Sequence, residues 1–263
     1  MIILLNSGKI QSARITDFSL HPMLCKSMES AMNAGKKIRQ NVKEIDIISY
    51  DFDGTLVDSI PDITTAINIT FQENKLPAVK AEQMETFVGD GIPLMVERAL
   101  RASLDEDKSP LLFDRYYNPI LKRYKILYSE HCTEKTGLYP GVKDILEHYS
   151  HKTQILITNK AETITHKMLT YFELDKYFDL IIGGDTLPER KPHPSVMEYV
   201  RSKYGPERLL CHVGDSPVDV KAAKQAEALS VAVLYGYSSP VILKNAKPDF
   251  LIHQIDELKN IIA

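Results

Sequence analysis

The chain has 263 residues, enough for one large domain or for a core domain with a smaller companion. Its 44% hydrophobic and 25% charged residues are typical of a soluble globular protein, and its net charge of −3 argues against nucleic acid or an anionic membrane as a partner. Three widely spaced cysteines without a CxxC pair argue against a disulfide framework and a zinc site. Because the sequence has no apolar run near the roughly 18 residues of a membrane helix and no signal-like n-region, it predicts a cytoplasmic protein.

The first 44 residues differ in charge from the rest of the chain. They carry seven Lys or Arg against three Asp or Glu, a local charge of +4. "MIILLNSGKIQSARI" predicts a hairpin, and "MESAMNAGKKIRQNV" has apolar residues at helical spacing. We predict that residues 1–44 form a basic extension. It is a surface appendage, the product of an upstream start site, or an arm that contacts a partner or a second copy.

A predicted buried strand ends in an acidic turn at "IDIISYDFDGTLVDS", residues 45–59. Asp51 and Asp53 follow its apolar run directly. Two like charges 4 Å apart cost about 1 kcal/mol in water and about 4 kcal/mol at an effective dielectric of 20. The turn therefore needs a cation or a basic side chain beside it.

Residues 60–138 predict an inserted helical cap. "PDITTAINITFQ", "PLMVERALRAS" and "PLLFDRYYNPILKRYKILYSEHC" have helical patterns with no clear strand between them. An insertion beside the strand ends is placed to act as a lid. Tyr117, Tyr124 and Tyr128 are expected to pack inside this cap and not to form a ligand platform.

Residues 139–263 alternate apolar runs with helical patterns. The predicted strands are 153–159, 178–185, 208–215 and 229–236, all rich in β-branched or other apolar residues. Together with 45–59 they predict an α/β core with a doubly wound parallel sheet. Ligands of such sheets bind beyond the carboxyl ends of the strands.

Polar residues that can build one site lie at or beyond these strand ends. They are Asp51, Asp53, Thr158, Asn159, Lys160, Lys191, Asp215 and Asp219. A cluster of carboxylates requires a cation, and all-oxygen ligands suit Mg²⁺, which bridges to substrate phosphate. The pattern therefore predicts magnesium-dependent phosphoryl chemistry.

Most of these residues have an expected role in that chemistry. Asp51 attacks the phosphorus to form an aspartyl-phosphate, while Asp53 protonates the leaving alkoxide and then activates water. Thr158 and Lys191 stabilise phosphoryl oxygens, and Asn159 is expected beside them in the substrate site. The predicted metal ligands are Asp51, Asp53, Asp215 and Asp219, of which the last can instead orient metal-bound waters or Lys191.

Four stretches, "DFDGTLVDS", "ITNK", "KPHP" and "VGDSPVD", resemble in this order the four motifs of the haloacid dehalogenase superfamily, most of whose members are phosphatases. The resemblance implies a Rossmann-like core at 45–59 and 139–263 with the helical cap at 60–138. More narrowly, "DGTLVDSIPDI" and "FVGDGIPLMVERAL" resemble phosphoglycolate phosphatases, which implies 2-phosphoglycolate as the small substrate. Two features depart from the pattern: the basic extension, and Glu227, where such enzymes usually carry a helix-ending glycine.

The cap loop Gly89-Asp90-Gly91 resembles the substrate-facing loop of such enzymes. Gly89 and Gly91 are expected to contact the substrate, since glycines allow close backbone approach. The helix that begins near Pro93 can offer N–H groups to a substrate carboxylate. Asp90 would repel that anion, so we expect it to point away or to pair with Arg98.

Other functions share these motifs. The substrate can be another small phosphate, such as a sugar phosphate, a nucleotide or pyrophosphate. A phosphotransferase like β-phosphoglucomutase has the same core residues and shields its aspartyl-phosphate from water until a second hydroxyl arrives. A non-catalytic binding protein that uses the basic extension is disfavoured by the intact catalytic residues. The oligomeric state stays open.

Overall fold

The computed structural model describes residues 43–104 and 110–263. Nearly all of the predicted basic extension therefore lies outside the described residues. Lys43–Ala263 form one compact unit. No helix in the described ranges is both long enough and apolar enough to cross a membrane.

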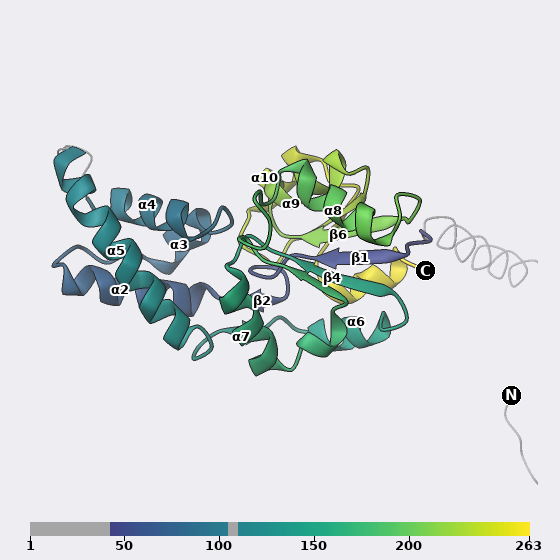
Figure 1. Cartoon of the computed structure of the whole chain (residues 1–263), viewed down its shortest axis with the longest axis horizontal. Helices are drawn as coiled ribbons and strands as arrows, with labels where there is room; N and C mark the ends of the chain where they lie inside the picture. Colours follow the sequence, from purple (N-terminus) through teal and green to yellow (C-terminus); the bar gives the residue numbers. More distant parts are fainter. Residues whose placement is uncertain (1–42, 105–109) are drawn as a thin grey trace, which may run out of the picture. The chain divides into compact units, whose positions relative to one another are not determined.

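A six-stranded parallel sheet in the order β5-β4-β1-β6-β7-β8 forms the core (Figure 1). Its strands are β1 (Ile47–Tyr50), β4 (Thr153–Ile157), β5 (Leu180–Ile182), β6 (Leu210–Gly214), β7 (Leu229–Val233) and β8 (Phe250–Ile252). The predicted α/β fold with a Rossmann-like core and an inserted helical cap is confirmed. Strand β8 is an addition, because three residues between short loops give too little pattern to predict a strand.

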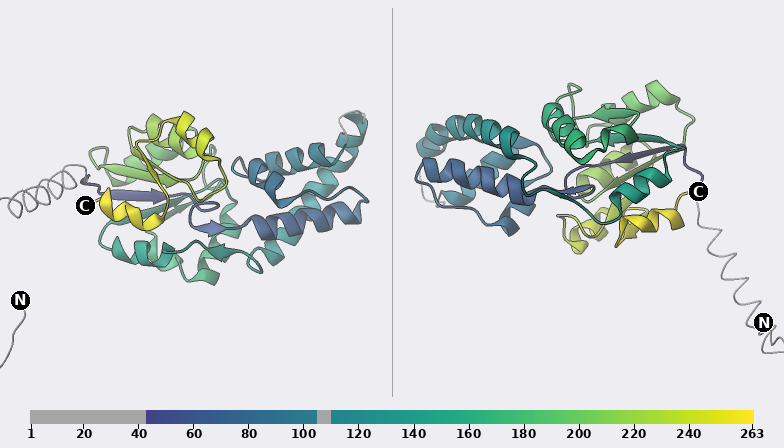
Figure 2. Two further views of the ribbon diagram at one scale, coloured as in Figure 1. Left: turned by 180° about the vertical axis from the view of Figure 1, so that it is seen from behind. Right: turned by 90° about the horizontal axis from the view of Figure 1, so that it is seen from below.

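Helices cover both faces of the sheet, as the views in Figure 2 show. They are α6 (Val142–His148), α7 (Glu162–Phe172), α8 (Pro194–Tyr204), α9 (Pro217–Gln225) and α10 (Pro240–Ala246), with short 3₁₀ helices at Asp175–Tyr177 and Ile255–Asn260. Neighbouring residues of β1 point to opposite faces, as strand geometry requires. Ile47 packs in a cluster with α8 and α9, whereas Ile48 packs in the cluster that holds α6 and α7.

β2 (Val57–Asp58) and β3 (Gly137–Leu138) pair antiparallel where the chain leaves and re-enters the core. The described residues between them form four helices. They are α2 (Ile60–Glu73), α3 (Ala81–Phe87), α4 (Ile92–Ser103) and α5 (Pro110–His131). Buried Asp62 of α2 accepts hydrogen bonds from the backbone N–H groups of Lys135 and Thr136. This contact fixes the returning chain against the helix that leads out.

Glu227 takes the left-handed conformation at the end of α9, with φ of +52°. Its N–H donates to Lys224 O at 3.1 Å, and the Ala228 N–H donates to Ala223 O at 2.9 Å. This pair of bonds is a Schellman motif, in which the left-handed position is normally glycine. The helix therefore ends at the place where related enzymes carry glycine, and here a strained glutamate occupies the left-handed position.

Glu227→Gly is expected to stabilise the protein by about 1 kcal/mol. An L-residue in the left-handed conformation costs roughly 1–2 kcal/mol, which glycine avoids, but glycine loses more chain entropy on folding, and this loss offsets part of the gain. A thermal unfolding curve should show the rise. Ala226→Gly is the control, since Ala226 has an ordinary φ of −96°. A gain at position 226 equal to that at 227 would contradict the strain at Glu227.

Candidate active site

Asp51 begins the site, directly after β1. The chain turns sharply at Gly54, whose φ is +77° and where a Cβ would lie 2.3 Å from an Asp215 carboxylate oxygen. Only glycine can make this turn and leave room for the acid beyond β6. The acidic turn predicted from the sequence is therefore brought against the end of a second strand.

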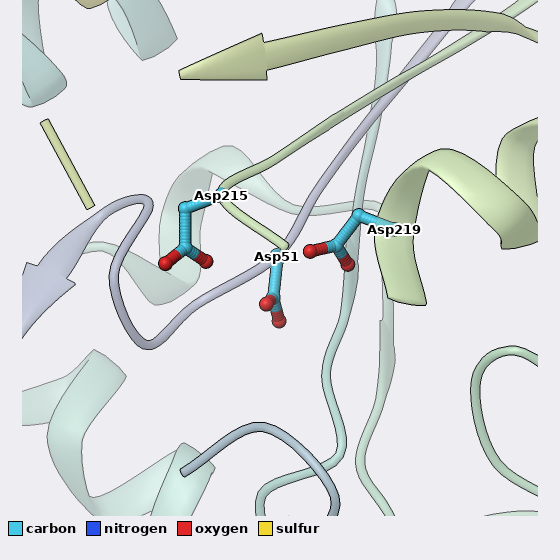
Figure 3. Close-up of side chains that lie close together, drawn as sticks. All are labelled: Asp51, Asp215 and Asp219. Carbon is cyan, nitrogen blue, oxygen red and sulfur yellow. The ribbon is translucent and has the colours of Figure 1, made fainter. Parts of the chain in front are cut away.

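Three carboxylates meet at the strand ends. Oxygens of Asp51, Asp215 and Asp219 lie within 4.8 Å of one another (Figure 3). Burial raises the pKa of Asp51 to about 7, against the attraction of Lys191 and with the help of the negative charge of Asp219. Burial, followed by the charges of Asp219 and Asp51, also holds the pKa of Asp215 well above its usual value. The cluster thus carries more buried negative charge than its surroundings neutralise.

Lys191 supplies the nearest positive charge. Its Nζ lies 2.9 Å from Asp51 Oδ1 and 2.7 Å from Asp219 Oδ1, and its side chain is 2% exposed. Burial acts to lower the pKa of Lys191, but Asp219 and Asp51 raise it above its ordinary value. The lysine is therefore a fixed cation in contact with the predicted nucleophile.

Both oxygens of Asp219 are already occupied. Oδ1 accepts from Lys191 Nζ at 2.7 Å and from His212 Nε2 at 3.2 Å. Oδ2 accepts from the backbone N–H of Ser216 at 3.0 Å and from its hydroxyl. Four donors match the roughly four lone-pair sites of a carboxylate. Despite its burial, Lys191 and His212 hold the pKa of Asp219 below its ordinary value, and we assign Asp219 to anchoring Lys191.

A divalent cation fits the remaining part of the cluster. Asp215 accepts from the Tyr237 N–H at 2.7 Å and, at 3.4 Å, from the Thr55 hydroxyl, which leaves lone pairs free for a metal. Asp51 has one oxygen toward Lys191 and another available. Two adjacent carboxylates with raised pKa values are the donor set that a hard cation such as Mg²⁺ neutralises. Asp51 and Asp215 are therefore the side chains that would hold it.

The carboxylate of Asp53 lies outside this cluster, unlike the predicted ligand set. Its oxygens lie 2.8 and 3.0 Å from Lys160 Nζ, and Oδ1 also accepts from the Ser59 hydroxyl at 2.6 Å. Lys160 is 3% exposed and also donates to the hydroxyl of Tyr128 at 2.6 Å. The side chain of Asp53 thus binds Lys160 and is not placed to bind the cation held by Asp51 and Asp215.

Thr158 and Asn159 were predicted to end the strand 153–159, and they directly follow β4, which is two residues shorter. The two residues have different surroundings. The Thr158 hydroxyl oxygen accepts from the Lys160 N–H at 3.2 Å, so its own hydrogen is available to a ligand. The Asn159 side-chain N–H₂ donates to Gly89 O at 2.8 Å and to Lys191 O at 2.9 Å. Asn159 therefore ties the cap loop to the loop that carries Lys191.

A cavity of about 70 Å³ lies between these core residues and the cap. Its lining includes Asp51, Asp53, Thr158, Lys160 and Asp215 from the core, and Gly89, Gly91, Tyr124 and Tyr128 from the cap. At roughly 10–15 Å³ of such volume per water molecule, the cavity holds only a small ligand. The cap loop therefore faces the same space as Asp51, Asp53 and Thr158, whereas Lys191 contacts Asp51 from outside the lining.

The structure bears on two expectations for the cap. Asp90 does pair with Arg98, with 2.6 Å between Oδ2 and Nη2, so its charge is neutralised. Tyr124 and Tyr128 are buried as expected, yet both line the cavity, and Tyr128 contacts Lys160. The prediction that Tyr124 and Tyr128 belong to the cap core is confirmed, and the contact of Tyr128 with Lys160 is an addition to it. Tyr117 is partly buried and packs against the same cluster. Helical spacing shows that a tyrosine faces inward but not that its hydroxyl reaches another segment.

Comparison with known proteins identifies the family. A model of the haloacid dehalogenase-like hydrolases matches residues 48–233. The chain belongs to this family. A phosphoglycolate phosphatase of Nitrosococcus oceani is 34% identical over 226 residues, which cover 84% of this chain and 98% of that one. One of Chromobacterium violaceum is 36% identical over 225 residues, with the same coverage of 84% and 98%.

A solved structure agrees with these sequence relatives. It is described as a predicted phosphoglycolate phosphatase from Haemophilus somnus, with a TM-score of 0.76, 30% identity and coverage of 83% of this chain and 98% of that one. The predictions of the family and of a phosphatase are therefore confirmed.

Proposed function

We propose that the protein is a magnesium-dependent phosphomonoester hydrolase that works through an aspartyl-phosphate on Asp51, with 2-phosphoglycolate as its substrate. The observation that carries the proposal is that Asp51, which contacts Lys191, lines a small cavity together with Asp53. A nucleophile, a fixed cation and a second carboxyl group are the parts that two-step phosphoryl transfer requires.

The proposed reaction has two steps, and the positions of these groups support it. An oxygen of Asp51 attacks the phosphorus, and the bond from phosphorus to the ester oxygen breaks. Asp53 gives a proton to the leaving oxygen and then takes one from the water that attacks the aspartyl-phosphate, which frees inorganic phosphate. Lys191 and the Thr158 hydroxyl donate to the phosphoryl oxygens as their charge shifts. Mg²⁺, when bound, neutralises the carboxylates and the phosphate and thus reduces the repulsion between them.

The cavity supports a small substrate. Its volume of about 70 Å³ suits a short phosphorylated acid better than a hexose phosphate or a nucleotide. Gly89 and Gly91 bring the cap backbone to the cavity, and α4 begins at Ile92, so backbone N–H groups can face a second anion there. The names of the two sequence relatives point to the same substrate. Activity on other small phosphates and β-phosphoglucomutase-like transfer are the alternatives.

Comparison of kcat/KM across a set of phosphate esters tests the substrate. We expect 2-phosphoglycolate to exceed glucose 6-phosphate, a nucleoside monophosphate and pyrophosphate by about a hundredfold or more, the range that an unmatched polar group in a closed site can impose. Addition of β-glucose 1-phosphate with its bisphosphate should give no glucose 6-phosphate. Preference for a hexose phosphate or for pyrophosphate would contradict the substrate while leaving the chemistry in place.

A further inference from the structure

Lys160 is the buried cation that the proposed mechanism does not use. Its ammonium group has three hydrogens, and three oxygens surround it: both carboxylate oxygens of Asp53, at 2.8 and 3.0 Å, and the hydroxyl of Tyr128, at 2.6 Å. With 3% of the side chain exposed, these contacts fix the ammonium in one orientation. Loss of any of the three oxygens would leave a buried N–H unpaired.

Tyr128 brings the cap into this network. It lies on α5 and is 1% exposed, with its ring stacked on Tyr124 at a centroid distance of 5.5 Å. Lys160 Nζ also lies 4.8 Å from the centre of the Tyr128 ring. The position of the phenol is thus set by packing inside the cap, and its hydroxyl reaches a core lysine 32 residues further along the chain.

Asp53 is held from two sides. Ser59 donates to Oδ1 at 2.6 Å, and the backbone N–H of Ser59 donates in turn to the Tyr237 hydroxyl at 2.8 Å. Lys160 holds both oxygens from the other side. The carboxyl group that must meet the leaving oxygen is therefore placed by one core contact and by one lysine that the cap orients.

We propose that Tyr128 is a positioning residue that acts through Lys160 on Asp53, so that proton transfer to the leaving group depends on contact with the cap. The inference rests on the proposed function, because it assigns a role within the step in which the ester bond breaks. An alkoxide leaving group needs the proton of Asp53. A nitrophenolate leaves without it, so its ester reports on the nucleophile alone.

The test compares Tyr128→Phe with wild-type protein on 2-phosphoglycolate and on 4-nitrophenyl phosphate, with magnesium present. General acid catalysis contributes about 10²–10⁴-fold to the rate. Partial misplacement of the acid should therefore lower kcat on the alkyl ester by about tenfold. The aryl ester should change less than about twofold. Lys160→Met should give the same pattern with a larger loss on the alkyl ester.

Tyr117→Phe is the matched control. Tyr117 lies on the same helix, and its hydroxyl donates to Pro93 O at 3.1 Å within the cap, at an exposed position that has no contact with Lys160. It should leave both esters within about twofold of wild type. Equal losses on both esters in Tyr128→Phe, or no loss on either, would overturn the inference. If wild-type protein hydrolysed neither ester, the proposed function and the inference would both be wrong. If Asp53→Asn retained only the aryl reaction, the proposed function would be supported whatever the result for Tyr128→Phe.

Discussion

Asp51→Asn is expected to abolish turnover of every phosphate ester while the protein stays folded. The substitution removes the attacking oxygen, and no other described carboxylate both touches Lys191 and keeps an oxygen available, since Asp219 is filled by four donors. The loss should reach the detection limit, at least about 10⁴-fold, as for other removed nucleophiles. Steady-state rates on 2-phosphoglycolate and 4-nitrophenyl phosphate measure it.

The same substitution should stabilise the metal-free protein. Burial raises the pKa of Asp51 from 3.8 to about 7, so the folded state retains a proton that the unfolded state releases. The stability of the wild type therefore falls as pH rises from about 4 to 7, by an upper limit of about 4 kcal/mol at 1.36 kcal/mol per unit. In EDTA the melting temperature of Asp51→Asn should exceed that of wild type at pH 8, and the difference should narrow toward pH 4.

Asp53→Asn, which keeps the proposed nucleophile Asp51, is the variant to compare with Asp51→Asn. It should lose the alkyl ester but retain part of its reaction with 4-nitrophenyl phosphate, because a phenolate leaves without a proton. Substantial hydrolysis of either ester by Asp51→Asn protein would contradict the assignment of the nucleophile.

Removal of divalent metal is expected to abolish activity, and Mg²⁺ should restore it. Without a cation, Asp51 and Asp215 tend to keep their protons, because the pKa values of both are raised, and once ionised they would repel the phosphate dianion. Ca²⁺ takes more ligands at longer distances than Mg²⁺ does, so it should bind without supporting turnover. Activity in EDTA, followed by addition of each ion, gives the measurement.

Thermal unfolding tests the metal site independently of activity. Mg²⁺ at a hundred times its dissociation constant should stabilise wild type by about 2.7 kcal/mol, and Asp215→Asn should lose most of that gain because Asp215 is assigned as a ligand. Full turnover in EDTA, or an unchanged magnesium-dependent stabilisation in Asp215→Asn, would contradict the proposed site.

The sheet was predictable because its strands are buried on both faces. Runs such as "TQILI" and "LCHVG" are nearly continuous apolar segments, which is typical of parallel strands between helices. Strand β8 was missed because "FLI" is too short to show a period. The end of α9 departs from the family's pattern because Glu227 replaces the usual glycine, and there the backbone hydrogen bonds prevail over the unfavourable φ of Glu227.

The site was predictable where motif residues follow strands. Asp51, Thr158 and Asp215 each come directly after one, and the carboxyl ends of parallel strands meet at one edge. One donor to Asp219, His212, had a weaker signal: it is a polar residue inside an otherwise apolar strand, and its other ring nitrogen lies 2.8 Å from the hydroxyl of Ser49 on β1. Nothing in the sequence indicated the contact between Tyr128 and Lys160, because no spacing relates a cap helix to a core loop.

Detection of a phosphorylated Asp51 tests the central claim most directly. Wild-type protein with Mg²⁺ would be mixed with excess substrate, quenched in acid within the first turnovers, digested and examined by mass spectrometry. The account predicts a phosphate on the peptide that contains Asp51, lost on treatment with hydroxylamine and more abundant in Asp53→Asn protein turning over 4-nitrophenyl phosphate. Turnover without any phosphopeptide at Asp51, or with the phosphate on another residue, would contradict it.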